Sequence, residues 1–126
     1  MEIRIRKRAF ESMLAGAAAA HPNEFVCLLT GSREKGKVLI EDTMIPPGIM
    51  VSRTMSSFSD WMMPVMTGVV GTFHSHPGGS ARPSRQDLRL FSNRGGVNFI
   101  AAEPFRAIDV AAFLGSGERV KFEVVE

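Results

Sequence analysis

A short run of histidine, proline and acidic residues constrains this chain more than any other feature. His74 and His76 stand two positions apart at the end of a mostly apolar segment, and Pro77 follows directly. Because side chains alternate along a strand, both imidazoles of an extended segment point to the same side. A glycine-rich turn can fold the chain back, so that a short helix starting near Ser84 would bring Asp87 against both imidazoles. Two neutral nitrogens and one carboxylate are the three-ligand pattern of a catalytic zinc site with a position left for water.

These residues resemble a known signature. The JAMM (MPN-plus) metalloprotease family carries the pattern H-x-H-P-x6-S-x2-D, and every specified position is matched between His74 and Asp87. Members of that family have a glutamate on an earlier strand, and Glu24 stands 50 residues before His74. The resemblance implies that His74, His76 and Asp87 bind one Zn²⁺ per chain. It further implies that Glu24 is the general base and that the Ser84 hydroxyl stabilises an oxyanion.

Each of these residues also has a plainer interpretation. Ser-x-x-Asp before apolar residues is a capping-box pattern, with Ser84 as N-cap and Asp87 at the positive end of the helix dipole. Both interpretations can hold together, since the dipole keeps a carboxylate ionised and a metal ligand must be ionised. A glutamate that opens a strand is usually only solvated. Alternation nevertheless gives Glu24 the same face as Val26 and Leu28, next to apolar residues, which favours the catalytic interpretation.

Hydrophobic periodicity predicts a sheet-rich protein with two helices. Helical spacing of apolar residues predicts helices at 7–20 and about 84–93. Other apolar stretches predict strands at 2–6 (an edge strand), 25–29, 37–42, 69–76, 97–102, 107–114 and 119–125, and a further strand with a loop or helical turn within 49–67. Gly71, inside one of these strands, indicates a close approach of another backbone or helix. The pattern alone indicates an α/β or α+β protein of one domain, 1–126. The resemblance implies a curved mixed β-sheet flanked by two helices, the cytidine-deaminase-like MPN/JAMM fold.

Composition excludes several other classes. The apolar runs are far shorter than the ~20 residues that a transmembrane helix needs, and no signal-peptide pattern is present. Cys27 is the only cysteine, so an internal disulfide is impossible and a reducing compartment is favoured. We therefore expect a cytoplasmic protein, with Cys27 as an inert buried thiol. The formal net charge of +2 selects no partner, and we expect neither nucleic acid nor membrane binding.

Two groups of residues are candidates for substrate contact. Arg82 and Arg85, with other arginines around the expected ligand helix, could bind an acidic or C-terminal substrate segment. A solvated helix face explains them equally well. Six of the eight methionines fall between Met44 and Met66, and Met62 and Met63 among them could contact an extended tail. Filling of the core is the competing explanation.

The resemblance implies a zinc-dependent metalloprotease or isopeptidase acting at the C-terminus of a ubiquitin-like modifier. A peptidase that processes the C-terminus of a sulfur-carrier protein would use the same chemistry. A metal-free MPN docking scaffold is a different class, but such relatives typically lack ligands that are present here. The absence of a Cys-x-x-Cys pair argues against a deaminase of the same fold. A homodimer formed through exposed edge strands is possible.

Overall fold

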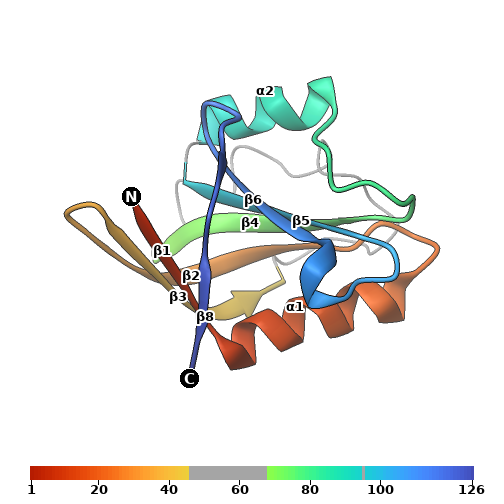
Figure 1. The fold of residues 1–126 in the computed structure, drawn as a ribbon, viewed down its shortest axis with the longest axis horizontal. Helices are drawn as coiled ribbons and strands as arrows, with labels where there is room; N and C mark the ends of the chain where they lie inside the picture. Colours follow the sequence, from red (N-terminus) through yellow and green to blue (C-terminus); the bar gives the residue numbers. More distant parts are fainter. Residues whose placement is uncertain (46–67, 95) are drawn as a thin grey trace.

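The structure is a computed structural model that describes residues 1–45, 68–94 and 96–126 (Figure 1). The strand and the loop or helical turn expected within 49–67 therefore lie outside the described residues, as do Met62 and Met63. In chain order the elements are β1 (Glu2–Arg6), α1 (Lys7–Ala20), β2 (Val26–Glu34), β3 (Lys37–Met44), β4 (Val69–His76), α2 (Arg85–Arg94), β5 (Val97–Ala102), the short 3-10 helix η3 (Ala107–Asp109), β6 (Val110–Leu114), β7 (Arg119–Val120) and β8 (Glu123–Val125).

Within the described residues, eight strands form one mixed sheet in the order β7-β6-β5-β4-β2-β3-β1-β8. The pairs β4–β5, β1–β3 and β1–β8 are parallel, and the remaining pairs are antiparallel. In a flat sheet with strands ~4.8 Å apart, β7 and β8 would be separated by ~34 Å. The three peptide steps from Val120 to Glu123 span at most ~11 Å. The sheet therefore curls until its two ends approach each other.

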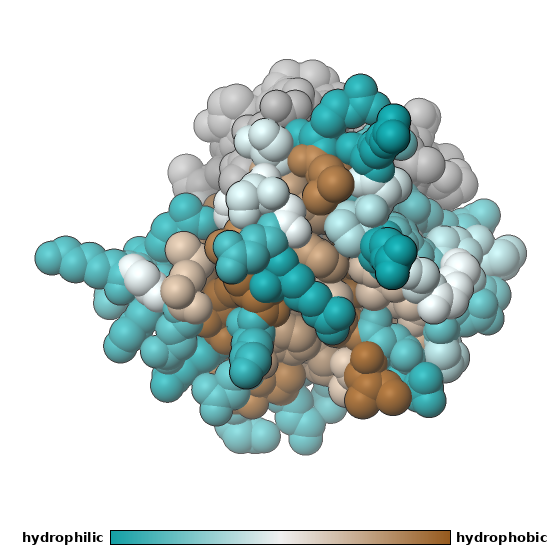
Figure 2. Space-filling model, turned by 45° about the horizontal axis from the view of Figure 1, so that its top comes forward, coloured by the Kyte–Doolittle hydropathy of each residue, from teal (hydrophilic) through white to brown (hydrophobic). Residues whose placement is uncertain are grey.

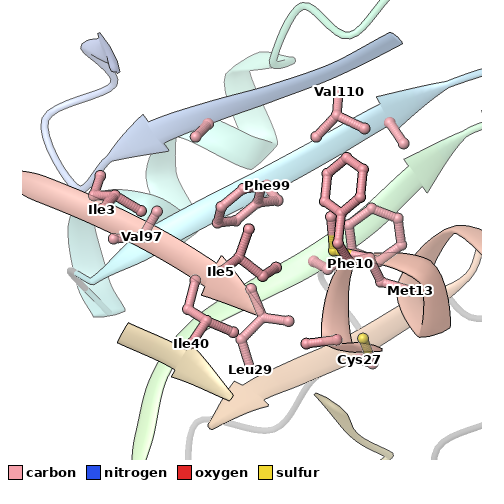
Figure 3. Close-up of a cluster of buried hydrophobic side chains, with 14 of the residues drawn as sticks. Ile3, Ile5, Phe10, Met13, Cys27, Leu29, Ile40, Val97, Phe99 and Val110 are labelled. Atoms are coloured by element: carbon pink, nitrogen blue, oxygen red, sulfur yellow. The ribbon is translucent and has the colours of Figure 1, made fainter. Parts of the chain in front are cut away.

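Helix α1 and the surrounding strands enclose the main core (Figure 3). Phe10, Met13 and Ala17 recur at helical spacing on the buried side of α1, which confirms the helix predicted at 7–20. They pack with buried residues of six strands: Ile3, Ile5, Cys27, Leu29, Val38, Ile40, Phe73, Val97, Phe99 and Val110. This core holds α1 firmly against one face of the sheet.

Helix α2 lies on the opposite face (Figure 1). Its Phe91 is fully buried and packs with Ile100, Ala111 and Phe113 in a smaller cluster. Alternation along β5 explains the two layers, because Phe99 belongs to the α1 core and its neighbour Ile100 belongs to the α2 cluster. The curved mixed sheet flanked by two helices is thus the architecture that the resemblance implied.

Several boundaries differ from the sequence predictions. The strand at 2–6 is not an edge strand, because β1 pairs with β3 on one side and β8 on the other. The stretch predicted as one strand at 119–125 is two short strands, β7 and β8, at opposite ends of the sheet. The region 107–114 begins as η3 and becomes a strand only at Val110. Strand β2 begins at Val26, one residue later than predicted, and continues to Glu34.

Gly71 confirms the close approach predicted for it. It pairs with Val97 in the parallel β4–β5 ladder, and a Cβ atom at this position would overlap the Val97 carbonyl oxygen. In the described part of the chain, no helix is long and apolar enough to cross a bilayer. The close contact of β4 with β5 matters for the site, because both candidate histidines stand at the end of β4.

Candidate metal centre

The two candidate histidines lie at the C-terminal end of strand β4. Phe73 points into the α1 core, so the alternate residues His74 and His76 point to the α2 face. The His74 ring lies beside Phe91 of α2, with 6.3 Å between ring centroids. His74 is fully buried, and the His76 side chain is 19% exposed. One histidine is thus enclosed by the protein while the other borders solvent.

Helix α2 brings the third candidate ligand to the same point. Asp87, in the first turn of α2, has its carboxylate 3.3 Å from His74 Nε2 and 3.2 Å from His76 Nε2. The two Nε2 atoms are 3.0 Å apart. Each of the three side chains offers one ligand atom, and these three atoms all lie within 4.8 Å of one another. The structure therefore brings together the three residues that the sequence motif suggested.

The chemistry of the donors fits a cation. His76 Nδ1 lies 2.9 Å from the Ser80 carbonyl oxygen and donates its hydrogen to it, so Nε2 of the neutral ring carries a lone pair. Two imidazole nitrogens at 3.0 Å beside a carboxylate concentrate electron density at one point. Donors bound to one tetrahedral zinc ion, each at 2.0–2.1 Å, would be ~3.3 Å apart, close to the three distances here. The set is suited to hold a metal ion.

The pKa values of Asp87 and His76 are shifted in opposite directions. Burial alone would raise the pKa of Asp87, but hydrogen bonds with His74, His76 and the Ser84 backbone, together with the charge effect of His74, hold that pKa far below its ordinary value. Burial alone would lower the pKa of His76. Its hydrogen bonds with Asp87 and the Ser80 carbonyl, and the negative charges of Asp87 and Glu24, raise that pKa overall. The carboxylate stays ionised, as a metal ligand must.

Ser84 and Asp87 also form a reciprocal helix cap. The Asp87 backbone N–H donates to Ser84 Oγ at 3.1 Å, and the Ser84 backbone N–H donates to Asp87 Oδ2 at 2.9 Å. This is the capping box that the spacing suggested. The same carboxylate faces both histidines, so the cap and the ligand geometry coexist. Since Ser84 Oγ is the acceptor in this bond, its hydroxyl hydrogen can point elsewhere.

Glu24 lies close enough to His76 for its charge to act on that ring, although it is not part of a strand. Strand β2 begins at Val26, whose partner in β4 is His74. Continuing this antiparallel register by two residues places Glu24 opposite His76. Glu24 is half-buried, and its charge acts on His76. The candidate base thus lies on the His76 side of the candidate metal centre, two residues before β2 begins and not at the first position of the strand as predicted.

The two arginines predicted to contact the substrate lie in different surroundings. Arg82 and Arg85 are both exposed. In the view of Figure 2, hydrophilic side chains form most of the outline of the molecule, and hydrophobic side chains show between them. Arg82 lines a hollow of about 360 Å³ that Arg85 does not border. Phe113 and Arg119 complete this hollow with the loop Ser80–Pro83. Sequence reasoning missed Arg119, since nothing local connects it to a loop more than 30 residues earlier in the chain.

Known structures resemble this arrangement along the whole chain. A structure described as JAMM, a metalloprotease-like zinc site in the proteasome and signalosome, matches with a TM-score of 0.75 and 30% identity and covers 100% of both chains. A JAB1/MPN domain protein from Archaeoglobus fulgidus matches with the same TM-score and identity, covering 99% of this chain and 98% of its own. Fold and site together define a JAMM/MPN domain with a metalloprotease-like metal centre.

Comparison with known sequences identifies the family to which the chain belongs within this class of domain. The chain belongs to the family of prokaryotic homologues of the JAB domain, whose model matches residues 6–115. A probable metalloprotease from Haloferax volcanii is 32% identical over 124 residues, which cover 94% of this chain and 76% of the relative. The family resemblance predicted from the histidine motif is therefore confirmed.

Proposed function

We propose that this protein is a zinc-dependent peptidase that hydrolyses a peptide or isopeptide bond at the C-terminus of a ubiquitin-like modifier. The convergence of His74, His76 and Asp87 within 3.0–3.3 Å carries this proposal, and the charge of Glu24, which acts on His76, supports it. The neighbouring structure described as a metalloprotease-like zinc site supports zinc as the metal. That zinc site belongs to the proteasome and signalosome, which supports a modifier-linked substrate.

In this proposal His74, His76 and Asp87 hold one zinc ion per chain. Zinc bound there supplies Lewis acidity, which makes water nucleophilic near neutral pH and polarises a carbonyl group. Glu24 accepts a proton from the attacking water and later delivers it to the nitrogen of the leaving amine. The Ser84 hydroxyl donates a hydrogen bond to the oxygen that becomes negative in the tetrahedral intermediate. Its cap leaves that hydrogen available.

Charge near the site supports an acidic or carboxylate-bearing segment as part of the substrate. Arg82 and Arg119 line the same hollow, and both side chains are exposed. The loop that carries Arg82 also holds His76 through the Ser80 carbonyl, so a segment bound in the hollow would lie near the reacting bond. Arg85, Met62 and Met63 remain proposed contacts.

The test combines metal analysis with a pair of matched substrates. Purified protein should contain about one zinc per chain and should cleave a modifier with a C-terminal Gly-Gly tail joined to lysine through an isopeptide bond. A chelator should abolish cleavage, and added zinc should restore it. Glu24→Gln should keep the zinc and lose about 100- to 10,000-fold in kcat, because only the proton acceptor is removed.

Other outcomes would point to the alternatives. Cleavage of a linear extension after Gly-Gly, without isopeptide cleavage, would favour processing of a sulfur-carrier protein. A protein that binds modifier but cleaves nothing with zinc present would favour a docking module. Cleavage that chelator leaves unchanged, or full activity in Glu24→Gln, would contradict the proposed mechanism.

A further inference from the structure

The residue next to the proposed base is fixed in an unusual way. Phe25 precedes β2, yet its backbone carbonyl accepts a hydrogen bond from the Ser75 N–H at 2.9 Å. In a regular antiparallel pair, the Phe25 N–H would return a bond to the Ser75 carbonyl. Here it donates to the Ser75 side-chain oxygen, at 2.8 Å. A hydroxyl thus replaces a backbone carbonyl at the point where the chain leaves the sheet.

Ser75 stands between the two histidines but faces the other side of the sheet. It is fully buried, and alternation places it on the α1 face with Phe73. The bond to Phe25 therefore connects the histidine strand to the Glu24 segment from behind the metal centre. Because the hydroxyl extends beyond the strand backbone, the two chains can diverge after Phe25 without leaving its N–H unpaired.

The Phe25 side chain supplies a second point of attachment. Its ring lies 6.1 Å from the Phe73 ring and against Gly16 of α1. A Cβ atom at position 16 would overlap the Phe25 ring. Glycine in a helix interior is unfavourable, so Gly16 is explained by the space that the ring requires. Phe25 is therefore held by its N–H, its carbonyl and its ring.

We propose that Ser75 is a positioning residue: by anchoring Phe25, it holds Glu24 beside the metal ligands. This inference rests on the proposed function of Glu24 as the proton acceptor. Ser75 touches neither substrate nor metal and acts only through the backbone of the Glu24–Phe25 segment. Gly16 takes part from the other side, since it admits the ring that completes the anchor.

The first experiment tests the attachment of Phe25 to Ser75 without measuring peptidase activity. Amide hydrogen exchange at Phe25 should be at least about tenfold faster in Ser75→Ala than in the native protein, because the acceptor of its N–H is lost. Ser75→Thr keeps an oxygen at the same branch and should restore slow exchange. Thr72→Val is the matched control: it removes a hydroxyl from the same strand, one that bonds Asn98 and not the Glu24 segment. Phe25 exchange should stay slow in that control.

The second experiment tests the connection with Glu24. Ser75→Ala should keep its zinc and its KM but lose about 10- to 100-fold in kcat, as expected for a displaced catalytic group. Added to Glu24→Gln, the same change should cause no further loss, because the group it positions is already disabled. Gly16→Ala should lower kcat in the same way, whereas Ala18→Ser, on the exposed side of α1, should not.

Two results would overturn the inference. One is an equal loss of kcat from Ser75→Ala in the native and Glu24→Gln backgrounds, which would show that Ser75 acts independently of Glu24. The other is full activity in Ser75→Ala together with fast exchange at Phe25. A zinc-loaded native protein without peptidase activity would instead overturn the proposed function, and the exchange data would then decide on the anchor alone.

Discussion

At the scale of single residues, the metal centre uses side chains in two roles at once. The Asp87 carboxylate completes the helix cap with Ser84 and faces both histidines. His76 uses Nδ1 to bond the Ser80 carbonyl and turns Nε2 toward the other donors. Such orienting bonds fix the tautomer and the ring plane before any ligand arrives. Substitutions here should therefore separate effects on stability from effects on chemistry.

Substitutions at Ser84 distinguish an effect on stability from an effect on catalysis most directly. Ser84→Ala should lower the free energy of unfolding by about 1 kcal/mol, since the N-cap is lost. Ser84→Gly should cost only about 0.3 kcal/mol, because glycine is tolerated at an N-cap. Both should lower kcat by roughly 100-fold if the hydroxyl stabilises the oxyanion. Denaturant titration and peptidase kinetics would measure the two effects, and a fully active Ser84→Gly would remove Ser84 from the proposed mechanism.

Cys27 should be inert in the folded protein. The thiol is fully buried, and burial raises its pKa to about 12. Between pH 9.0, the ordinary pKa of the thiol, and about pH 12, the unfolded chain would lose this proton while the folded protein keeps it. Alkaline pH therefore favours unfolding, and the contribution of the buried thiol to stability falls as pH rises through this window. Mass spectrometry after iodoacetamide at pH 8 should show no native alkylation but full alkylation in denaturant.

At the scale of elements, the position of helix α2 determines whether Asp87 reaches the two histidines. Among the described side chains of α2, Asp87 makes polar contacts with the histidines, and the buried packing of Phe91 holds the helix in position as well. The Phe91 ring stacks on Phe113 with centroids 6.1 Å apart and also lies against His74. The helix and the enclosed histidine thus share one buried ring.

Removing that ring should weaken both stability and metal binding. Phe91→Ala should lower the free energy of unfolding by about 3–5 kcal/mol through the cavity it leaves, and zinc affinity should fall because Asp87 is displaced. Leu88→Ala is the control on the same helix; Leu88 is 39% exposed, so a change within about 0.5 kcal/mol is expected. Thermal unfolding and zinc titration would test both variants. Unchanged zinc affinity in a folded Phe91→Ala protein would contradict this dependence.

Local pattern predicted some elements well and others poorly, for physical reasons. Helix α1 and strand β4 were predictable because amphipathic spacing and alternation are local properties. The pairing of β1 with β8 and the division of 119–125 were not, since strand periodicity does not say which strand is the neighbour. The three candidate ligands were suggested by one short motif, whereas Arg119 reaches the hollow only through sheet topology. The place of Glu24 ahead of β2 depends on the hydrogen bond that the Ser75 hydroxyl oxygen accepts from the Phe25 N–H, which no periodicity encodes.

At the scale of the whole molecule, the metal should join two layers. The histidines belong to the sheet and Asp87 to α2, so bound zinc would connect the sheet to the helix on its α2 face. Free zinc at about 100 times its dissociation constant should add about 2.7 kcal/mol to stability. For a chain of this length, that corresponds to a rise of roughly 8 °C in Tm.

Asp87→Asn provides the matched control for this prediction. It keeps a side-chain oxygen for the Ser84 N–H but removes the charge from the ligand set. The variant should unfold near the Tm of the metal-free native protein and should gain little from added zinc. Differential scanning calorimetry with and without chelator would measure both shifts. A native Tm that is insensitive to zinc would contradict binding at this site.

The last strands of the sheet have a consequence for self-association. One continuous stretch, Arg119–Val125, pairs with β6 at one end of the strand order and with β1 at the other. A chain shortened after Gly117 would leave outward backbone amides of both β6 and β1 without partners. Unpaired edges of this kind template intermolecular sheets and aggregation. The C-terminal stretch thus protects the fold against edge-to-edge polymerisation.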